Sequence, residues 1–270
     1  MDDIFRSERQ LYIGGKWQEG RGARRTIVNP ADESELLEVR EASPEQVDEA
    51  VRAAHDAFHR GEWSLSSQMR SEKLRELARK VKESSARLAR LETLNTGKTC
   101  REALLDVHDA ADCLTYYADL IERQSPRRFP QENGTVSEIR KEPVGVCALI
   151  VPWNFPLLLG VWKLAPALAA GNTVVFKPSE HTPLSMLYFT ALLEQSGIPP
   201  GVFNLVPGDG MVGERIVAHE QVAKVSFTGG TETGRHIYEL CARKFKKVSL
   251  ELGGKSPLRA ERSAGISITG

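Results

Sequence analysis

The chain has 270 residues, 41% of them hydrophobic, which is enough to bury a core of its own. Its 36 lysines and arginines balance 36 aspartates and glutamates, so no net charge attracts nucleic acid or an anionic membrane surface. Four cysteines without a CxxC pair, six scattered histidines, no signal segment and no apolar run of ~18 residues predict a soluble, cytoplasmic protein with no metal site.

The first half of the chain is predicted to be helical over residues 43–123. Ser43 is followed by a proline and, three residues on, by a glutamine, which is the pattern of a capped helix start. A second amphipathic stretch is predicted from about residue 67 to 94 and is closed by Gly97. A third runs from residue 101 to 123. These helices are expected to be scaffold.

Residues 126–143 are rich in proline and charge, with a short alternation of apolar and polar residues after Gly134. This pattern is typical of an exposed hairpin rather than of a core strand. The segment is predicted to be an arm or a linker.

From residue 144 the pattern changes to short apolar strands that alternate with helical segments. Such alternation predicts an α/β fold with a doubly wound, Rossmann-like parallel sheet. Open sheets of this kind bind ligands beyond the carboxyl ends of their strands. The predicted strands are 144–151, 173–176, 202–206, 223–227 and 248–252.

Polar residues follow the first two of these strands. Asn154 lies in a turn between two prolines, where its amide can donate to a developing oxyanion or simply satisfy the turn backbone. Lys177 and Glu180 come after the second strand, and a cation and a carboxylate at that spacing suit the hydroxyls of a ribose. They equally suit a surface pair at a helix start.

The fourth strand leads into a glycine-rich turn, in which Gly229 and Gly234 flank a predicted helix start. Free backbone N–H groups there can bind a pyrophosphate, although Thr231 breaks the G-x-G-x-x-G pattern and the signal alone is weak. Gly97-Lys98-Thr99 resembles the end of a P-loop, but Glu92 replaces the first glycine of that motif and its context is helical. We therefore discard it.

The last predicted strand delivers Glu251 to a second glycine turn, which suits a general base. Together these turns, in this order and after strands, resemble the aldehyde dehydrogenase superfamily, and the betaine aldehyde or broad-specificity branch most of all. The likeness extends from about Leu11 to Pro257. The segments that carry it are Pro152-Trp-Asn-Phe-Pro156, Lys177-Pro-Ser-Glu180, Phe227-Thr-Gly-Gly-Thr-Glu-Thr-Gly234, Glu251-Leu-Gly-Gly-Lys-Ser-Pro257, and, earlier in the chain, Tyr12-Ile-Gly-Gly-Lys-Trp17, Asn29-Pro30 and Leu91-Glu-Thr-Leu-Asn-Thr-Gly-Lys98.

The resemblance implies a role for each matched residue. Asn154 would lie in the oxyanion hole, and Glu251 would activate the water that hydrolyses a thioester. The cofactor would be held by Ile150 and Trp153 at the cleft, Lys177 and Glu180 at the adenosine ribose, Gly229, Gly230 and Gly234 at the pyrophosphate, and Leu252 at the nicotinamide.

The same resemblance implies the reaction, in which an aldehyde is oxidised to an acid through a cysteine thiohemiacetal with hydride transfer to NAD. Glu180 should repel a 2'-phosphate, which makes NADP the less favoured cofactor. The resemblance also implies a coenzyme-binding domain of residues 1–124 and 144–257, a hairpin over 125–143 through which the family forms homo-oligomers, and a divergent tail over 258–270.

The family's nucleophilic cysteine would lie beyond Gly270, so the catalytic domain is expected to be absent. Cys113, Cys147 and Cys241 fall in apolar or helical stretches, and Cys100 belongs to the helical scaffold, so none is expected to replace it. Two hypotheses follow. The chain is a truncated aldehyde dehydrogenase that is inactive alone, or it is a non-catalytic NAD-binding remnant or a partner of a full-length subunit.

Overall fold

The structure, a computed structural model, describes residues 9–255 and is built around a seven-stranded sheet with the order β11-β10-β7-β8-β9-β1-β2. Five of these strands run parallel and form the predicted doubly wound sheet. They are β7 (Val146–Ile150), β8 (Thr173–Lys177), β9 (Phe203–Leu205), β10 (Val222–Gly229) and β11 (Lys247–Leu252).

One edge of this sheet was not predicted. The strands β1 (Leu11–Ile13) and β2 (Lys16–Gln18) form a hairpin that adds to β9 in the antiparallel direction. Asn204 of β9 holds the hairpin turn, because its side-chain oxygen accepts from the Gly14 N–H at 2.9 Å and its amide donates to the carbonyl oxygens of Val174 and Gly201. With three residues each, these strands are too short to show a period in the sequence.

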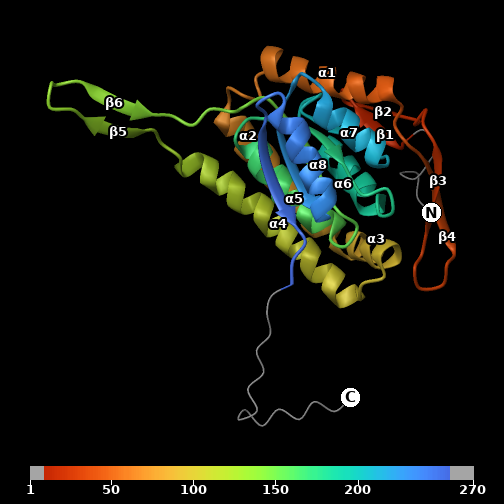
Figure 1. The fold of residues 1–270 in the computed structure, drawn as a ribbon. Coiled ribbons are helices and arrows are strands. Elements are labelled where there is room, and N and C mark those ends of the chain that lie inside the picture. Colours follow the sequence, from red (N-terminus) through yellow and green to blue (C-terminus); the bar gives the residue numbers. More distant parts are fainter. Residues whose placement is uncertain (1–8, 256–270) are drawn as a thin grey trace, which may run out of the picture.

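Helices cover both faces of the sheet, as Figure 1 shows. Along β7 the residues alternate, so that Ala148 and Ile150 pack in the cluster with α1, α7 and α8, whereas Cys147 and Leu149 pack in the cluster with α2 to α6. The helices of the first face are α1 (Pro44–Arg60), α7 (Gly210–Ala218) and α8 (Thr231–Ala242). The others are α2 (Ser67–Glu83), α3 (Ser85–Thr96), α4 (Cys100–Arg123), α5 (Pro156–Ala169) and α6 (Leu184–Gln195).

The helical boundaries agree with the sequence at α1 and differ at α2. Ser43 caps α1 in a capping box with Gln46. The stretch expected to run from residue 67 to 94 is two helices, because the chain breaks at Ser84, which ends α2 and starts α3. Gly97 ends α3 in the left-handed conformation with φ 79°, as its position suggested.

Two ribbons stand apart from the sheet. The predicted hairpin is present as β5 (Arg127–Pro130) and β6 (Val136–Ile139), which extend away from the body beyond the end of α4 (Figure 1). The second ribbon, β3 (Arg24–Val28) and β4 (Glu35–Arg40), lies at the opposite end of the molecule (Figure 1). Among residues 9–255 there is no helix with the length and hydropathy that crossing a bilayer requires.

Candidate cofactor cleft and its neighbours

A cleft of about 770 Å³ opens at the carboxyl ends of β7, β8 and β10, between the starts of α7 and α8. From β7 the chain adds β8 and β9 on one side of β7, and it then passes through α7 to add β10 on the other side. The cleft therefore lies at the topological switch point of the sheet. Six of the residues proposed for the cofactor line it, namely Ile150, Trp153, Lys177, Glu180, Gly229 and Gly230.

Lys177 and Glu180 form the polar wall of this cleft. The Lys177 side chain is buried, and its ammonium donates to the Pro178 carbonyl oxygen at 3.1 Å and to the Glu180 carboxylate at 3.5 Å. Burial lowers the pKa of Lys177 despite this pairing. For half-buried Glu180 burial raises the pKa, but the ammonium and a backbone hydrogen bond outweigh it and lower the pKa overall. Glu180 is therefore a carboxylate at neutral pH.

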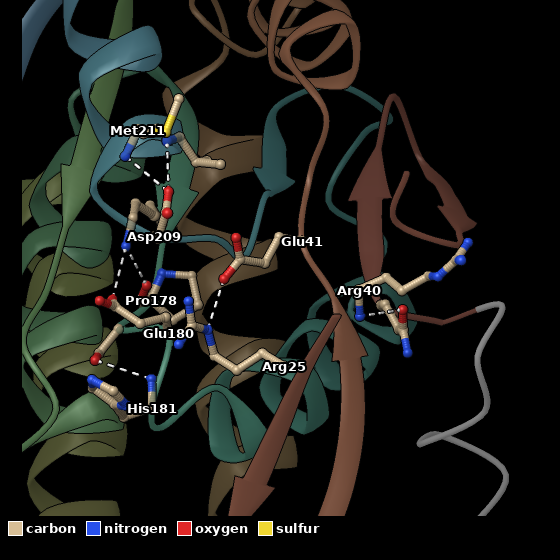
Figure 2. Close-up of polar contacts among 12 residues, drawn as sticks. Arg25, Arg40, Glu41, Pro178, Glu180, His181, Asp209 and Met211 are labelled. Carbon is tan, nitrogen blue, oxygen red and sulfur yellow. Dashed lines mark hydrogen bonds and ion pairs between the residues drawn. The ribbon is translucent and has the colours of Figure 1, made fainter. Parts of the chain in front are cut away.

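Sequence reasoning missed three charged residues around this pair. Asp209 lines the cleft and caps α7, accepting from the backbone N–H group of Met211 (Figure 2) and from that of Val212. Arg25 of β3 donates to Glu41 at 2.7 Å, and its pKa is raised by that hydrogen bond and by the charges of Glu180 and Asp209. Arg25 and Glu41 belong to the β3–β4 ribbon, which is far from Lys177, Glu180 and Asp209 in the sequence, so no local pattern placed these groups together.

The start of α8 forms the opposite wall. Its N-cap is Gly230, which has no side chain to accept from the first N–H groups of the helix, and Gly229, Gly230 and Thr233 line the cleft at this end. Gly234 does not line the cleft. A Cβ at Gly234 would lie 2.3 Å from a methyl of Leu252, so this glycine permits close packing of α8 on the end of β11. Leu252 itself is 41% exposed.

The turn between β7 and α5 exposes the side chains of Trp153, Asn154 and Phe155. Of these, only Trp153 lines the cleft. The turn leads directly into α5, whose N-cap is Phe155 and whose first turn begins at Pro156. Asn154 thus stands at the rim, next to the cleft rather than within it.

Glu251 lies on the other face of the sheet. Along β11, Val248 and Leu250 pack toward α8, so Ser249 and Glu251 point the opposite way. There Glu251 lines a second hollow of about 860 Å³ together with Lys163, whose pKa is lowered by burial. Lys163 donates to the Ser226 hydroxyl at 3.3 Å. Glu251 therefore lies on the opposite face of the sheet from the cleft that Lys177 and Glu180 line.

The thiols of residues 9–255 are poorly placed for nucleophilic attack. Cys147 lines the second hollow, but burial raises its pKa to about 12. Burial likewise raises the pKa of Cys113 to about 11 and raises that of Cys241. Cys100 is exposed at the start of α4, away from both hollows. Within the same residues, no group of three or more His, Cys, Asp or Glu side chains is arranged to hold a metal ion.

Comparison with known proteins identifies the fold's family. A family model described as "Aldehyde dehydrogenase family" matches residues 17–267, which is nearly the whole chain. The chain belongs to the aldehyde dehydrogenase family. The resemblance drawn from the motifs is thereby confirmed.

Several aldehyde dehydrogenases are similar over most of this chain. Aminoaldehyde dehydrogenase 2 of Zea mays is 47% identical in an alignment of 261 positions that covers 93% of this chain and 51% of the relative. Betaine aldehyde dehydrogenase of Bacillus subtilis is 41% identical, and the alignment covers 96% of this chain and 54% of that protein. A crystal structure of betaine aldehyde dehydrogenase from Staphylococcus aureus in complex with NAD+ superposes with a TM-score of 0.88 at 43% identity, over 91% of this chain and 50% of that one. The chain spans about half the length of these aldehyde dehydrogenases.

Proposed function

We propose that this chain binds NAD in the cleft at the carboxyl ends of β7, β8 and β10. The observation that carries the proposal is the opposition of two walls, the Lys177–Glu180 pair on one side and the uncapped start of α8 on the other. The carboxylate of Glu180 would accept from the ribose hydroxyls and Lys177 would donate to them. The N–H groups after Gly230 would bind the pyrophosphate. Support comes from the similar Staphylococcus aureus enzyme, which was crystallised with NAD+.

We further propose that NAD is preferred to NADP. Glu180 is ionised at neutral pH, and a 2'-phosphate on the ribose would bring a second negative charge to it. Asp209 adds negative charge to the same cleft. The Lys177 ammonium already donates to Glu180 and to the Pro178 carbonyl oxygen, so it offsets little of the repulsion between Glu180 and a 2'-phosphate.

For the whole enzyme we propose the oxidation of an aldehyde to a carboxylic acid. Bound NAD would supply the hydride acceptor. Asn154 at the rim would donate its amide to the oxyanion, and Glu251 would take a proton from the hydrolytic water. Because the described thiols are buried or remote from both hollows, the attacking cysteine would have to come from outside residues 9–255. In that case the 270 residues alone would bind the cofactor without turning it over.

A second candidate function is a non-catalytic NAD-binding protein or a partner of a full-length subunit. The exposed arm supports a partner, since Phe129, Val136 and Ile139 place large apolar side chains on its surface. We propose that this arm joins copies of the chain, or joins it to a longer relative, in the cytoplasm.

The experiment that tests the proposal is calorimetric titration of the purified chain with NAD and with NADP, with aldehyde-dependent NADH formation followed in the same preparation. We expect NAD binding, weaker NADP binding and no turnover. Lys177→Met should weaken NAD binding, whereas Lys82→Met, which removes an exposed ion pair with Asp112, should not. Absence of NAD binding in a folded chain would contradict the proposal, and turnover that survives replacement of all four cysteines by serine would contradict the assignment of an external nucleophile.

A further inference from the structure

The two helices that follow the cleft loops start without caps of their own. α5 begins directly after the turn of residues 152–156, and α6 begins after the loop that carries Glu180. Their N-cap residues, Phe155 and Pro183, make no side-chain cap hydrogen bond. A helix start leaves backbone N–H groups that need acceptors, and the first-turn residues Leu157 of α5 and Leu184 of α6 are buried.

The missing acceptors come from the last turns of α3. Glu92 accepts from the Leu157 N–H at 3.3 Å, in the first turn of α5. Asn95 accepts from the Leu184 N–H at 3.2 Å, at the start of α6, and its amide donates to the His181 carbonyl oxygen at 2.9 Å. Glu92 and Asn95 are three residues apart and so share one face of α3. One helix therefore caps two others.

Lys98 reinforces the contact with the first of these helices. Its ammonium lies 4.0 Å from the centre of the Phe155 ring and 3.6 Å from a Glu92 carboxylate oxygen, and it pairs with Asp106. Glu92 is fully buried, and burial raises its pKa. A neutral carboxyl still accepts through its carbonyl oxygen, so the cap does not require a charge at Glu92.

We propose that Glu92 and Asn95 are positioning residues for the cofactor cleft. By capping α5 and α6 from a third helix, they set the turn that carries Trp153 and Asn154 and the loop that carries Glu180 in a fixed relation to each other. Neither residue lines the cleft, so both act through the helices they cap. The inference rests on the proposed function in so far as NAD binding is one of its readouts.

The test uses the full chain with the indole N–H groups of its four tryptophans labelled for NMR, the Trp153 resonance being assigned with Trp153→Phe. Glu92→Leu removes the cap at similar volume, and Glu92→Gln keeps the acceptor. We expect Glu92→Leu to shift the Trp153 resonance and to weaken NAD binding about fivefold, the equivalent of one lost hydrogen bond. Glu92→Gln should restore both values.

Asn95→Ala tests the second cap, at the start of α6, and distinguishes an effect on the loop of Glu180 from an effect on the turn of Trp153. It should weaken NAD binding by a similar factor through the loop of Glu180, with the Trp153 resonance unchanged. The matched control is Ser71→Ala, which removes a buried hydrogen bond between α2 and the Ala118 carbonyl oxygen of α4. This control should lower the melting temperature and leave NAD affinity and the Trp153 resonance as they were.

A purely structural role would make Glu92→Leu and Asn95→Ala behave like the Ser71 control, and that result would overturn the proposal. If Glu92→Leu does not fold, Asn95→Ala decides, and unchanged NAD affinity in it counts against the proposal. If the parent chain does not bind NAD, the proposed function has failed independently. The Trp153 resonance in Glu92→Leu then decides the positioning role alone.

Discussion

The ammonium of Lys177 lies 3.5 Å from the carboxylate of Glu180, and Glu180 is the more exposed of the two, with 28% of its side chain exposed against 5% for Lys177. The pair therefore presents an acceptor, backed by a cation, to whatever enters. A diol can donate to such an acceptor, whereas a phosphate at the same place is repelled by it.

Glu180→Gln should change the preference between the two dinucleotides. Removing one charge a few ångströms from a 2'-phosphate is expected to improve NADP binding relative to NAD by about tenfold, or about 1.4 kcal/mol. Calorimetric titration with both cofactors measures the ratio. Glu232→Gln, which removes an exposed carboxylate paired with Arg235 in the first turn of α8, is the control and should leave the ratio unchanged. An unaltered ratio in Glu180→Gln would show that the 2'-position lies elsewhere.

Lys246 should give the chain's stability a pH dependence above neutrality. Burial lowers its pKa to about 8, although its ammonium donates to the carbonyl oxygens of Val217 and His219 at the end of α7. The folded state thus loses this proton near pH 8 and the unfolded chain only near its ordinary value of 10.5. Between these values the unfolded state binds more protons, so this residue's contribution to stability rises with pH.

Urea unfolding at pH 7.0 and 9.5 measures this effect as a difference between the parent chain and Lys246→Gln. The parent should gain stability relative to the variant as the pH rises. A difference that is constant with pH would show that Lys246 titrates normally in the folded chain.

Two glycines of the α8 turn should respond differently to alanine. At Gly230 a Cβ meets nothing within 4 Å, so Gly230→Ala should change the free energy of unfolding by less than about 0.5 kcal/mol. At Gly234 the Cβ overlaps the Leu252 side chain, and Gly234→Ala should cost about 1–2 kcal/mol as that side chain moves. Denaturant melts of the two variants compare them directly, and equal stabilities would mean that Leu252 does not pack on α8.

The thiols should divide by accessibility. Cys100 is exposed and should react with a disulfide reagent at once, whereas Cys147 and Cys241 are buried with raised pKa values and should react only as the chain unfolds. Half-buried Cys113, with a pKa of about 11, should be intermediate. Stopped-flow absorbance resolves the phases, and loss of the fast phase in Cys100→Ser identifies it. A fast phase that persists in this variant would contradict the packing of the sheet.

The arm should control assembly. Phe129→Ser with Ile139→Ser removes apolar side chains that are 44% and 58% exposed, and should lower the sedimentation mass of any oligomer while leaving the melting temperature of the monomer unchanged. Arg128→Ser, on the same ribbon, tests whether charge rather than apolar area matters. If the parent chain sediments as a monomer, the arm does not join copies of this chain.

The parts of the fold set by local pattern were predictable from the sequence. The cap at Ser43, the stop at Gly97 and the parallel strands all follow from short-range signals. The break at Ser84 was missed because both sides of it keep a helical period, and Ser84 makes no side-chain cap hydrogen bond to mark the start of α3.

The candidate site was predictable only where its residues follow strand ends. Lys177, Glu180 and Gly229 line one cleft because parallel strands end at the same edge of the sheet. The face of the sheet on which Glu251 lies also follows from the alternation of side chains along β11. The family resemblance implied a catalytic role for Glu251 but did not say on which face of the sheet it lies. The caps from Glu92 and Asn95 join segments 65 and 89 residues apart, and no local pattern contains them.

The antiparallel hairpin at the sheet edge has a consequence for synthesis. Its turn is held by a hydrogen bond between Gly14 and Asn204, which are 190 residues apart. At translation rates of about 5–20 residues per second, roughly 10–40 s therefore pass between the synthesis of β1 and that of its partner strand β9. During that interval Leu11, Tyr12 and Ile13, which are buried in the folded chain, have no sheet to join. β1 is therefore made long before its partner strand and is among the last strands to pair, so its apolar side chains are open to chaperones in the meantime.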